Sequence, residues 1–295
     1  HPSRRQAASR GLGRLDVSEL TDQERREIVR QVPLLSAKRL DDHQIGLLLA
    51  NPETRNPLYL LAALEELKGF GSYERLTDRI AAFPHPGMDA SALARAGFKP
   101  APADNLSGDV QVFLQVVQRL ERECGSHLVR RVLSLLAVSR HGLSEQELLD
   151  LTGTDGAGAP SRQEEAEQVF GLLAQLRPHL QHRGELLSFY HMSFLAAVRT
   201  WYAQHEEQSA RPLHADLARY FLRVARPAEG RWDDRAIHAL SELPLHQLRA
   251  GLWDELEKTL TDLRFVEAKS RAGMPYDLLG DYGSAGEEAR QLERA

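Results

Sequence analysis

Apolar residues recur at helical spacing through the first third of the chain. The 3.6-residue pattern predicts helices over about residues 22–31, 42–51, 57–67 and 72–82. Thr21 stands three residues before Glu24, as in a capping box, in which each side chain bonds the backbone N–H of the other residue. Pro57 occupies a position where the first turn of a helix tolerates proline. We therefore expect a helical domain over residues 1–83.

The next stretch interrupts every periodic pattern. Glycine and proline recur through it, and both residue types favour turns over regular helix. They are Pro84, Pro86, Gly87, Gly97, Pro100, Pro102 and Gly108. We interpret residues 84–108 as a linker between domains.

Residues 109–205 show the order of elements of a winged-helix domain. Helices are predicted over residues 109–123, 126–139, 144–152 and 161–176, strands over 179–182 and 185–191, and a last helix over 193–204. His141-Gly142 ends one helix directly before a second capping box, which pairs Ser144 with Glu147, so two helices meet through a tight turn. A third capping box, which pairs Ser161 with Glu164, is predicted to open the helix that follows. The two strands are expected to form a hairpin joined at Arg183-Gly184.

Residues 206–295 read as a second helical domain, or as the start of an array of helical repeats. Short helices are predicted over residues 213–224, 235–243, 245–250, 253–260 and 265–272, with separate helices on either side of Pro244. Residues 273–295 are polar, and we expect them to be incompletely ordered. The predicted fold class is mainly α: a helical domain, a winged-helix domain with a short β-hairpin, and then an α-helical array.

Composition places the chain among packed globular proteins. Its 295 residues are 42% hydrophobic and 27% charged, which is enough for more than one domain with a core of its own. Its single cysteine excludes an intramolecular disulfide and favours a reducing, cytoplasmic setting. No apolar run approaches the ~20 residues that a membrane-spanning helix needs. The chain starts at His1 without methionine or a signal peptide, so we expect a fragment of a longer protein.

No complete catalytic site can be assembled from the sequence. Neither a Gly-x-x-x-x-Gly-Lys-Ser/Thr loop nor a Gly-x-Gly-x-x-Gly loop is present. Cys124 and His127 lack a third, orienting group, so a packing role is favoured. His179, His182 and His191 lack the cysteine or carboxylate partners of a zinc site. His191 follows two aromatic residues at the end of a wing strand and would project from a fixed scaffold, although a core or surface histidine explains it equally well.

Charge bears on whether the winged helix reads DNA. The net charge is −5, and the third winged-helix helix begins with an acidic stretch that includes Glu164, Glu165 and Glu167, which phosphates would repel. A basic face from Arg130, Arg131 and Arg140 is the counter-evidence. An intramolecular or protein-binding winged helix is favoured. The alternative is a winged-helix DNA-binding transcriptional regulator with a helical partner-binding domain.

The order of motifs over residues 1–280 resembles the region that follows the P-loop core in signal-transducing NTPases of the NACHT and NB-ARC groups, the STAND class. The segments that carry the resemblance are Arg14-Leu15-Asp16-Val17, Asn56-Pro57-Leu58-Tyr59-Leu60, Phe70-Gly71-Ser72-Tyr73-Glu74, Ser139-Arg140-His141-Gly142-Leu143-Ser144 and Phe189-Tyr190-His191. A further segment, residues 260–269, is similar to NACHT proteins that bear WD or tetratricopeptide repeats.

The resemblance implies a regulatory role without catalysis by this chain alone. Pro57 matches the family proline near the adenine, although Asn56 replaces the usual glycine context, and His191 matches the histidine at the β-phosphate of ADP. Both would be lid contacts that close over ADP or ATP. The implied partners are the chain's own N-terminal P-loop core, which would precede His1 and carry any ATPase chemistry, and a C-terminal repeat sensor. The resemblance also implies a ligand-induced homo-oligomer, with neither nucleic acid nor membrane as a partner.

Overall fold

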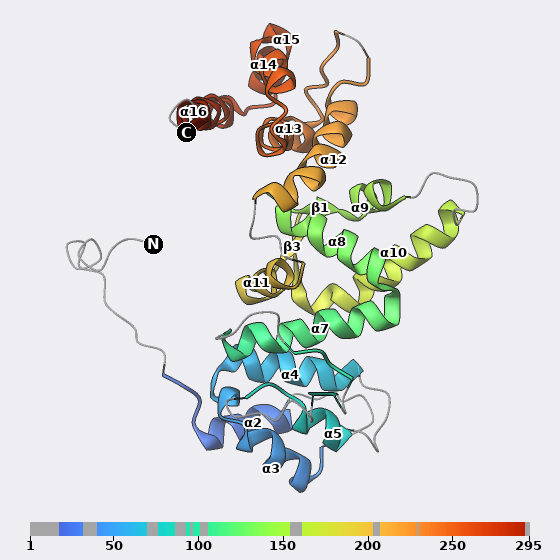
Figure 1. Cartoon of the computed structure of the whole chain (residues 1–295), viewed down its shortest axis with the longest axis vertical. Helices are drawn as coiled ribbons and strands as arrows, with labels where there is room; N and C mark the ends of the chain where they lie inside the picture. Colours follow the sequence, from blue (N-terminus) through green and yellow to red (C-terminus); the bar gives the residue numbers. More distant parts are fainter. Residues whose placement is uncertain are drawn as a thin grey trace, which may run out of the picture. The chain divides into compact units, whose positions relative to one another are not determined.

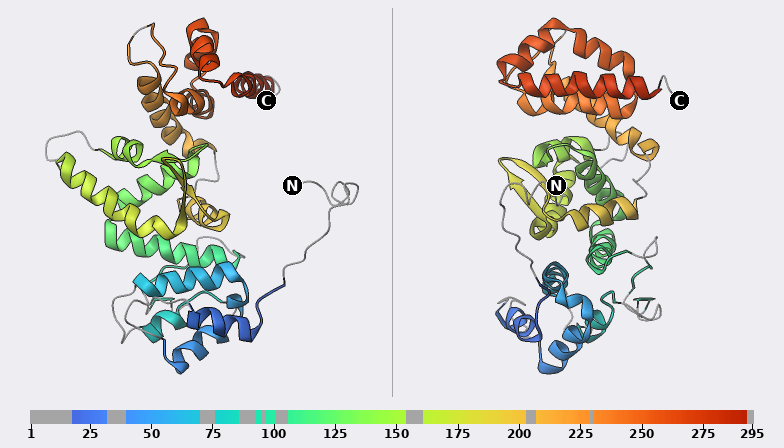
Figure 2. Two further views of the ribbon diagram at one scale, coloured as in Figure 1. Left: turned by 180° about the vertical axis from the view of Figure 1, so that it is seen from behind. Right: turned by 90° about the vertical axis from the view of Figure 1, so that its left-hand side faces the viewer.

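The computed structural model describes residues 18–31, 40–69, 76–85, 93–94, 97–100, 106–153, 161–202, 207–228 and 230–292. The chain forms two compact units, one of residues 1–100 and 107–112 and the other of residues 101–106 and 113–295. Figures 1 and 2 show a mainly helical chain with one small antiparallel sheet, which confirms the predicted fold class. No helix in the described parts has the length and apolar character needed to cross a membrane.

The first unit is helical. Its elements are α2 (Asp22–Gln31), α3 (Asp42–Ala50), η1 (Pro52–Arg55), α4 (Pro57–Gly69) and α5 (Leu76–Ala81). The Thr21–Glu24 capping box is confirmed, because the Thr21 N–H donates to Glu24 Oε2 at 2.7 Å and the Glu24 N–H donates to Thr21 Oγ1 at 3.3 Å. Tyr59 of α4 is fully buried, and Asn51 Nδ2 donates both to its hydroxyl and to the Pro84 carbonyl. These bonds fix the start of α4 against the chain that follows α5.

Helix α7 (Gly108–Cys124) starts within one residue of the predicted position and runs from the first unit into the second. Most of the predicted linker lies outside the described residues. The part that the structure covers includes two helical residues, Leu93 and Ala94.

The winged-helix segment of the second unit follows the predicted order. Its elements are α8 (Ser126–Val138), β1 (Leu143–Ser144), α9 (Glu145–Thr152), α10 (Arg162–Leu176), η2 (Arg177–His179), β2 (Leu180–Arg183), β3 (Leu186–Phe189) and α11 (Met192–Trp201). Both predicted capping boxes form, Ser144 with Glu147 and Ser161 with Glu164. Two details differ. The sheet has three strands in the order β1-β3-β2, and the hairpin turn lies at Gly184-Glu185, one residue later than predicted.

Gly142 makes the third strand possible. Its φ is +97°, and a Cβ at this position would lie 2.2 Å from the carbonyl oxygen of Leu187 on β3. The chain therefore passes from α8 into β1 in direct contact with the β3 backbone, where Leu143 pairs with Leu187. Only glycine combines this conformation with this close approach.

The C-terminal part of the second unit consists of consecutive helices. They are α12 (Glu207–Ala225), α13 (Ile237–Ala250), α14 (Trp253–Thr261), α15 (Leu263–Arg271) and α16 (Pro275–Leu292). The prediction of two helices separated at Pro244 is wrong, because α13 continues through this proline. Pro244 has no N–H to donate and its ring crowds the carbonyl of the preceding turn, but extensive packing of α13 on α12 supports the helix on both sides of it.

The C-terminal segment was predicted to be incompletely ordered, yet residues 275–292 form the helix α16. Its anchor is electrostatic. Asp277 and Asp281 lie one helical turn apart, and both bind the fully buried ammonium group of Lys269 on α15. A buried cation with two carboxylate partners fixes a helix whose sequence is otherwise polar and rich in glycine.

Candidate functional site at the winged helix

Pro57 and His191, the two residues expected to contact nucleotide, lie in different units. Pro57 is the first residue of α4 and is exposed. Asn56 caps this helix, because its Oδ1 accepts the Leu58 N–H at 2.9 Å. The proline ring therefore sits on a fixed helix end with its surface open. A role shared by Pro57 and His191 remains a prediction.

His191 is the N-cap residue of α11, but its side chain makes no capping bond. The imidazole stacks on Phe113 at 6.1 Å between ring centroids and meets the edge of Tyr190 at 4.4 Å. The neighbouring Tyr190 and Met192 are 62% and 73% exposed. Burial lowers the pKa of His191, so the ring is neutral at neutral pH and carries one N–H donor. Aromatic packing thus orients a half-exposed imidazole beside two exposed apolar side chains.

The other two histidines of this region have different settings. His179 is buried and packs edge-on against Phe113 and Phe194, at 5.7 and 5.3 Å between centroids. His182 is exposed on β2. Within the part of the chain that the structure describes, no group of three histidine, cysteine, aspartate or glutamate side chains is arranged to hold a metal ion.

Cys124 lies at the end of α7. It lines a pocket of about 380 Å³ together with His127 and residues of α9 and α10. Its Sγ accepts a hydrogen bond from Gln175 Nε2 at 3.2 Å. Burial raises the pKa of the thiol, which disfavours the thiolate that a nucleophile needs. The geometry therefore supports the packing role expected from the sequence.

The arginines that could have formed a basic DNA-binding face are engaged within the unit. Arg131 pairs with Asp216 at 2.7 Å and also donates to the carbonyl of Leu151. Arg140 pairs with Asp277 at 3.0 Å, and the guanidinium of Arg130 lies 5.6 Å from the Tyr202 ring centroid. Each of these guanidinium groups has a partner within the unit, although Arg130 and Arg140 remain exposed.

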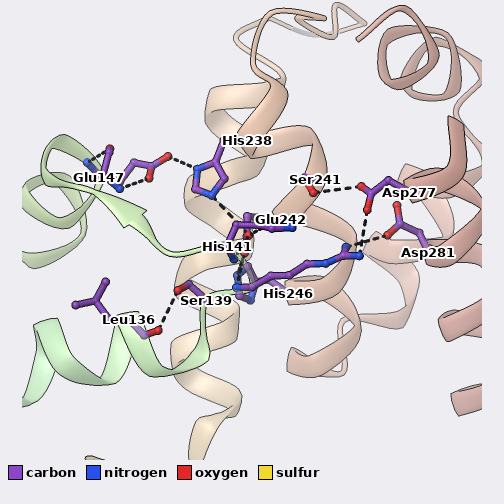
Figure 3. Close-up of polar contacts among 12 residues, drawn as sticks. Leu136, Ser139, His141, Glu147, His238, Ser241, Glu242, His246, Asp277 and Asp281 are labelled. Atoms are coloured by element: carbon purple, nitrogen blue, oxygen red, sulfur yellow. Dashed lines mark hydrogen bonds and ion pairs between the residues drawn. The ribbon is translucent and has the colours of Figure 1, made fainter. Parts of the chain in front are cut away.

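A cluster that the sequence did not reveal lies where the turn between α8 and β1 meets α13, and Figure 3 labels five of its members, His141, Glu147, His238, Glu242 and His246. We call it the Glu242 junction; its members are Arg140, His141, Glu147, His214, His238, Glu242 and His246. The carboxylate of Glu242 is fully buried. It accepts the backbone N–H groups of Arg140 and His141 at 3.0 Å each, His141 Nδ1 at 2.8 Å and His246 Nε2 at 3.0 Å. One side chain of α13 thus holds the turn of the winged helix.

His238 makes a second link between α13 and the winged helix. Its Nδ1 lies 2.8 Å from Glu147 Oε1 on α9, and its Nε2 lies 3.5 Å from Glu242 Oε1, an ion-pair distance that is long for a hydrogen bond. Burial lowers the pKa of His238, but the two carboxylates outweigh burial and raise this pKa to about 9. Burial raises the pKa of Glu242, but the three imidazoles outweigh it and hold the pKa far below its usual range. At neutral pH the pair is therefore a partly buried cation beside a fully buried anion.

His246 passes the contact on to α12. Its Nε2 faces Glu242, which only accepts, so this nitrogen carries a proton. Its Nδ1 lies 2.7 Å from Nδ1 of His214, so these two nitrogens share one proton. Burial and the neighbouring His246 lower the pKa of His214 to about 3. His214 is therefore neutral whichever of the two rings carries the shared proton.

An outer layer ties the same turn to the last helices. The guanidinium of Arg140 pairs with Asp277 at 3.0 Å and lies 3.8 Å from Asp281, the two carboxylates that also bind Lys269. Ser241 of α13 donates to Asp277 at 3.2 Å. The winged-helix turn is therefore bonded directly to α13 and α16, and it shares the two aspartates of α16 with Lys269 of α15.

The sequence did contain one signal for this cluster. His238, Glu242 and His246 recur at intervals of four residues, which places them on one face of a single helix. The predicted break at Pro244 put His246 on a separate helix and hid the repeat. His141 and Glu147 lie about 100 positions away, and only the fold brings them to this face.

Comparison with known proteins gives distant relatives only. No family model and no solved structure matches the chain. A TPR repeat-containing protein of Dictyostelium discoideum is 24% identical over 254 residues, which cover 86% of this chain and 13% of that protein. Telomerase protein component 1 of Rattus norvegicus is 25% identical over 291 residues, which cover 89% of this chain and 10% of that protein. NACHT domain- and WD repeat-containing protein 1 of Homo sapiens is 27% identical over 210 residues, which cover 57% of this chain and 13% of that protein.

The chain thus matches only 10–13% of the length of these relatives. The names of two of them include TPR or WD repeats, and one includes a NACHT domain. The chain is similar to segments of much longer proteins, two of which are named for their repeats.

Proposed function

We propose that this chain is a regulatory, non-catalytic region of a STAND-type NTPase switch. The similarity to a NACHT- and WD-named protein supports the class, and the winged-helix order of elements in the second unit supports the assignment within it. In this proposal a P-loop core supplies nucleotide binding. The second unit serves as a lid and connects that core to a C-terminal repeat sensor.

The setting of His191 carries the proposal. Its neutral imidazole is oriented by Phe113 and Tyr190, makes no capping bond, and can donate one hydrogen bond to a phosphate oxygen. Pro57, exposed at the first turn of α4, would pack against the adenine. Bound ADP would favour the closed state, because opening removes the contact with His191.

The Glu242 junction gives the proposal a route from the sensor to the lid. A repeat domain that displaces α14–α16 would strain the ion pairs between α16 and the turn before β1. That turn continues through the sheet to β3, and His191 follows β3 by two residues. Movement of the C-terminal helices would therefore displace His191 from a bound phosphate, and release of ADP would permit oligomerisation.

Replacing His191 with leucine is expected to accelerate ADP release from the full-length protein about 10- to 100-fold. The reason is the loss of one hydrogen bond to a charged group, which contributes about 1.5–3 kcal/mol. Basal activation should rise in parallel. Stopped-flow release of a fluorescent ADP analogue measures the rate.

His182→Leu is the matched control, since this exposed histidine lies on β2 of the same sheet. It should leave the ADP release rate unchanged. If ADP leaves the His191→Leu variant at a rate within twofold of the wild-type rate, His191 does not contact the nucleotide.

A further inference from the structure

His238 stands between two carboxylates that come from different parts of the fold. Its Nδ1 lies 2.8 Å from Glu147 on α9, and its Nε2 lies 3.5 Å from Glu242 on α13 (Figure 3). An ionised carboxylate only accepts hydrogen bonds, and a neutral imidazole has only one N–H. With a neutral ring, one of the carboxylates would face a nitrogen lone pair. Only the doubly protonated ring suits both partners.

Both carboxylates already accept backbone hydrogen bonds. Glu147 Oε2 accepts the Ser144 N–H of the capping box at 2.8 Å, and Glu242 accepts the N–H groups of Arg140 and His141. Backbone donors favour the ionised form of a carboxylate, so neither glutamate is placed to take the proton from His238. The imidazole is the group that holds it.

The remaining neighbours do not offset these two negative charges. The ring of Phe221 on α12 meets His238 edge-on at 5.2 Å. Three other imidazoles lie near this pair: His141 of the turn and His246 of α13 bond Glu242, and His214 of α12 bonds His246. The hydroxyl of Tyr220 on α12 interacts electrostatically with Glu147. The cations Arg140 and Lys269 are directed at Asp277 and Asp281 on α16. The His238 side chain is 20% exposed, so its proton can exchange with solvent.

We propose that the proton on His238 is a structural ligand that clamps the winged helix to α13, and that losing it as pH rises releases the clamp. The clamp joins residues 91 positions apart and belongs to the second unit alone. It therefore operates whether or not the protein binds a nucleotide.

The direction of the response follows from the pKa. In the clamped form, the pKa of His238 is raised from 6.5 to about 9. Because the pKa is higher in this form, the proton stabilises the clamp fully below pH 6.5, and this stabilisation is lost as pH rises through 9. Between pH 7 and pH 9 the ratio of clamped to unclamped molecules should fall roughly fortyfold.

Two measurements on the full chain test the clamp. Nuclear magnetic resonance of the His238 imidazole reports its titration, which should be centred near pH 9. Electron spin resonance measures the distance between labels at Gln163→Cys on α10 and Lys258→Cys on α14, two exposed positions, in a Cys124→Ser background. The distance distribution should be narrow at pH 7 and should broaden over the range in which His238 titrates.

Glu147→Gln is the decisive variant. Glutamine retains the capping box but removes one of the two negative charges. The titration of His238 should move toward neutral pH by one pH unit or more, and the distance change should move with it. His238→Gln cannot hold the proton and should give the broad distribution at every pH, whereas the exposed control His182→Gln should behave as wild type.

Three outcomes would overturn the proposal. The first is a His238 titration centred near pH 6.5, and the second is a label distance that stays constant from pH 7 to pH 9. The third is a Glu147→Gln variant in which neither the His238 titration nor the change in label distance moves along the pH scale. If His238→Gln does not fold, Glu147→Gln still decides, because it preserves the helix start.

Discussion

Replacing Glu242 with glutamine is expected to lower the free energy of unfolding of the second unit by about 3–5 kcal/mol, as breaking a buried ion pair does. The groups bonded to this carboxylate are donors: two backbone N–H groups and the nitrogens of His141 and His246. Glutamine replaces one acceptor oxygen with an NH₂ group, so donors would face a donor. His238 would also keep only one of its two negative partners.

Urea unfolding at pH 7, followed by tryptophan fluorescence, measures this loss. All three tryptophans, Trp201, Trp232 and Trp253, lie in the second unit, so the signal reports that unit alone. Glu257→Gln makes the same chemical change on the exposed side of α14 and should alter the stability by less than about 0.5 kcal/mol. A loss below about 1 kcal/mol for Glu242→Gln would show that the junction contributes little to the fold.

Replacing Gly142 with alanine is expected to destabilise the second unit by about 4 kcal/mol. One part of this cost is the backbone conformation, since positive φ in a residue other than glycine costs about 1–3 kcal/mol. The other part is the contact 2.2 Å from the Leu187 carbonyl oxygen, a backbone atom that cannot move without displacing β3. The substitution should therefore separate β1 from β3.

Gly125→Ala separates the two contributions. Gly125 has a similar φ of +89°, but nothing lies within 4 Å of the position that its Cβ would occupy. We expect only the conformational cost there, about 1–3 kcal/mol. Equal losses from the two variants, measured by the same fluorescence titration, would contradict the assigned role of the β3 contact.

Local chemistry predicted the helix starts and failed where tertiary contacts decide. The capping boxes at Thr21, Ser144 and Ser161 predicted helix starts because each motif contains its own hydrogen-bond partners. The strand β1 has two residues, too few for a periodic pattern, and pairs only because Gly142 allows close approach to β3. Helix α16 depends on Lys269, a partner from the preceding helix that its own sequence does not reveal.

In the candidate site, too, local sequence predicted some positions, and tertiary contacts decided the others. The end of a short strand and the following helix predicted the position of His191, and the structure places this residue at the N-cap of α11. The sequence could not place it relative to Pro57. The role of Glu242 could not be predicted, because a glutamate on a helix usually faces solvent. Only the fold brings its partners from residues 140–147 to it.

In the proposed switch, the C-terminal helices act on bound nucleotide through the Glu242 junction and His191. A double-mutant cycle of ADP release rates in the full-length protein tests it most directly, with Glu147→Gln to loosen the clamp and His191→Leu to remove the phosphate contact. We expect Glu147→Gln to accelerate ADP release in the wild-type background and to have no further effect in the His191→Leu background. Rates that multiply in the double variant, or a Glu147→Gln rate equal to that of the wild type, would contradict it.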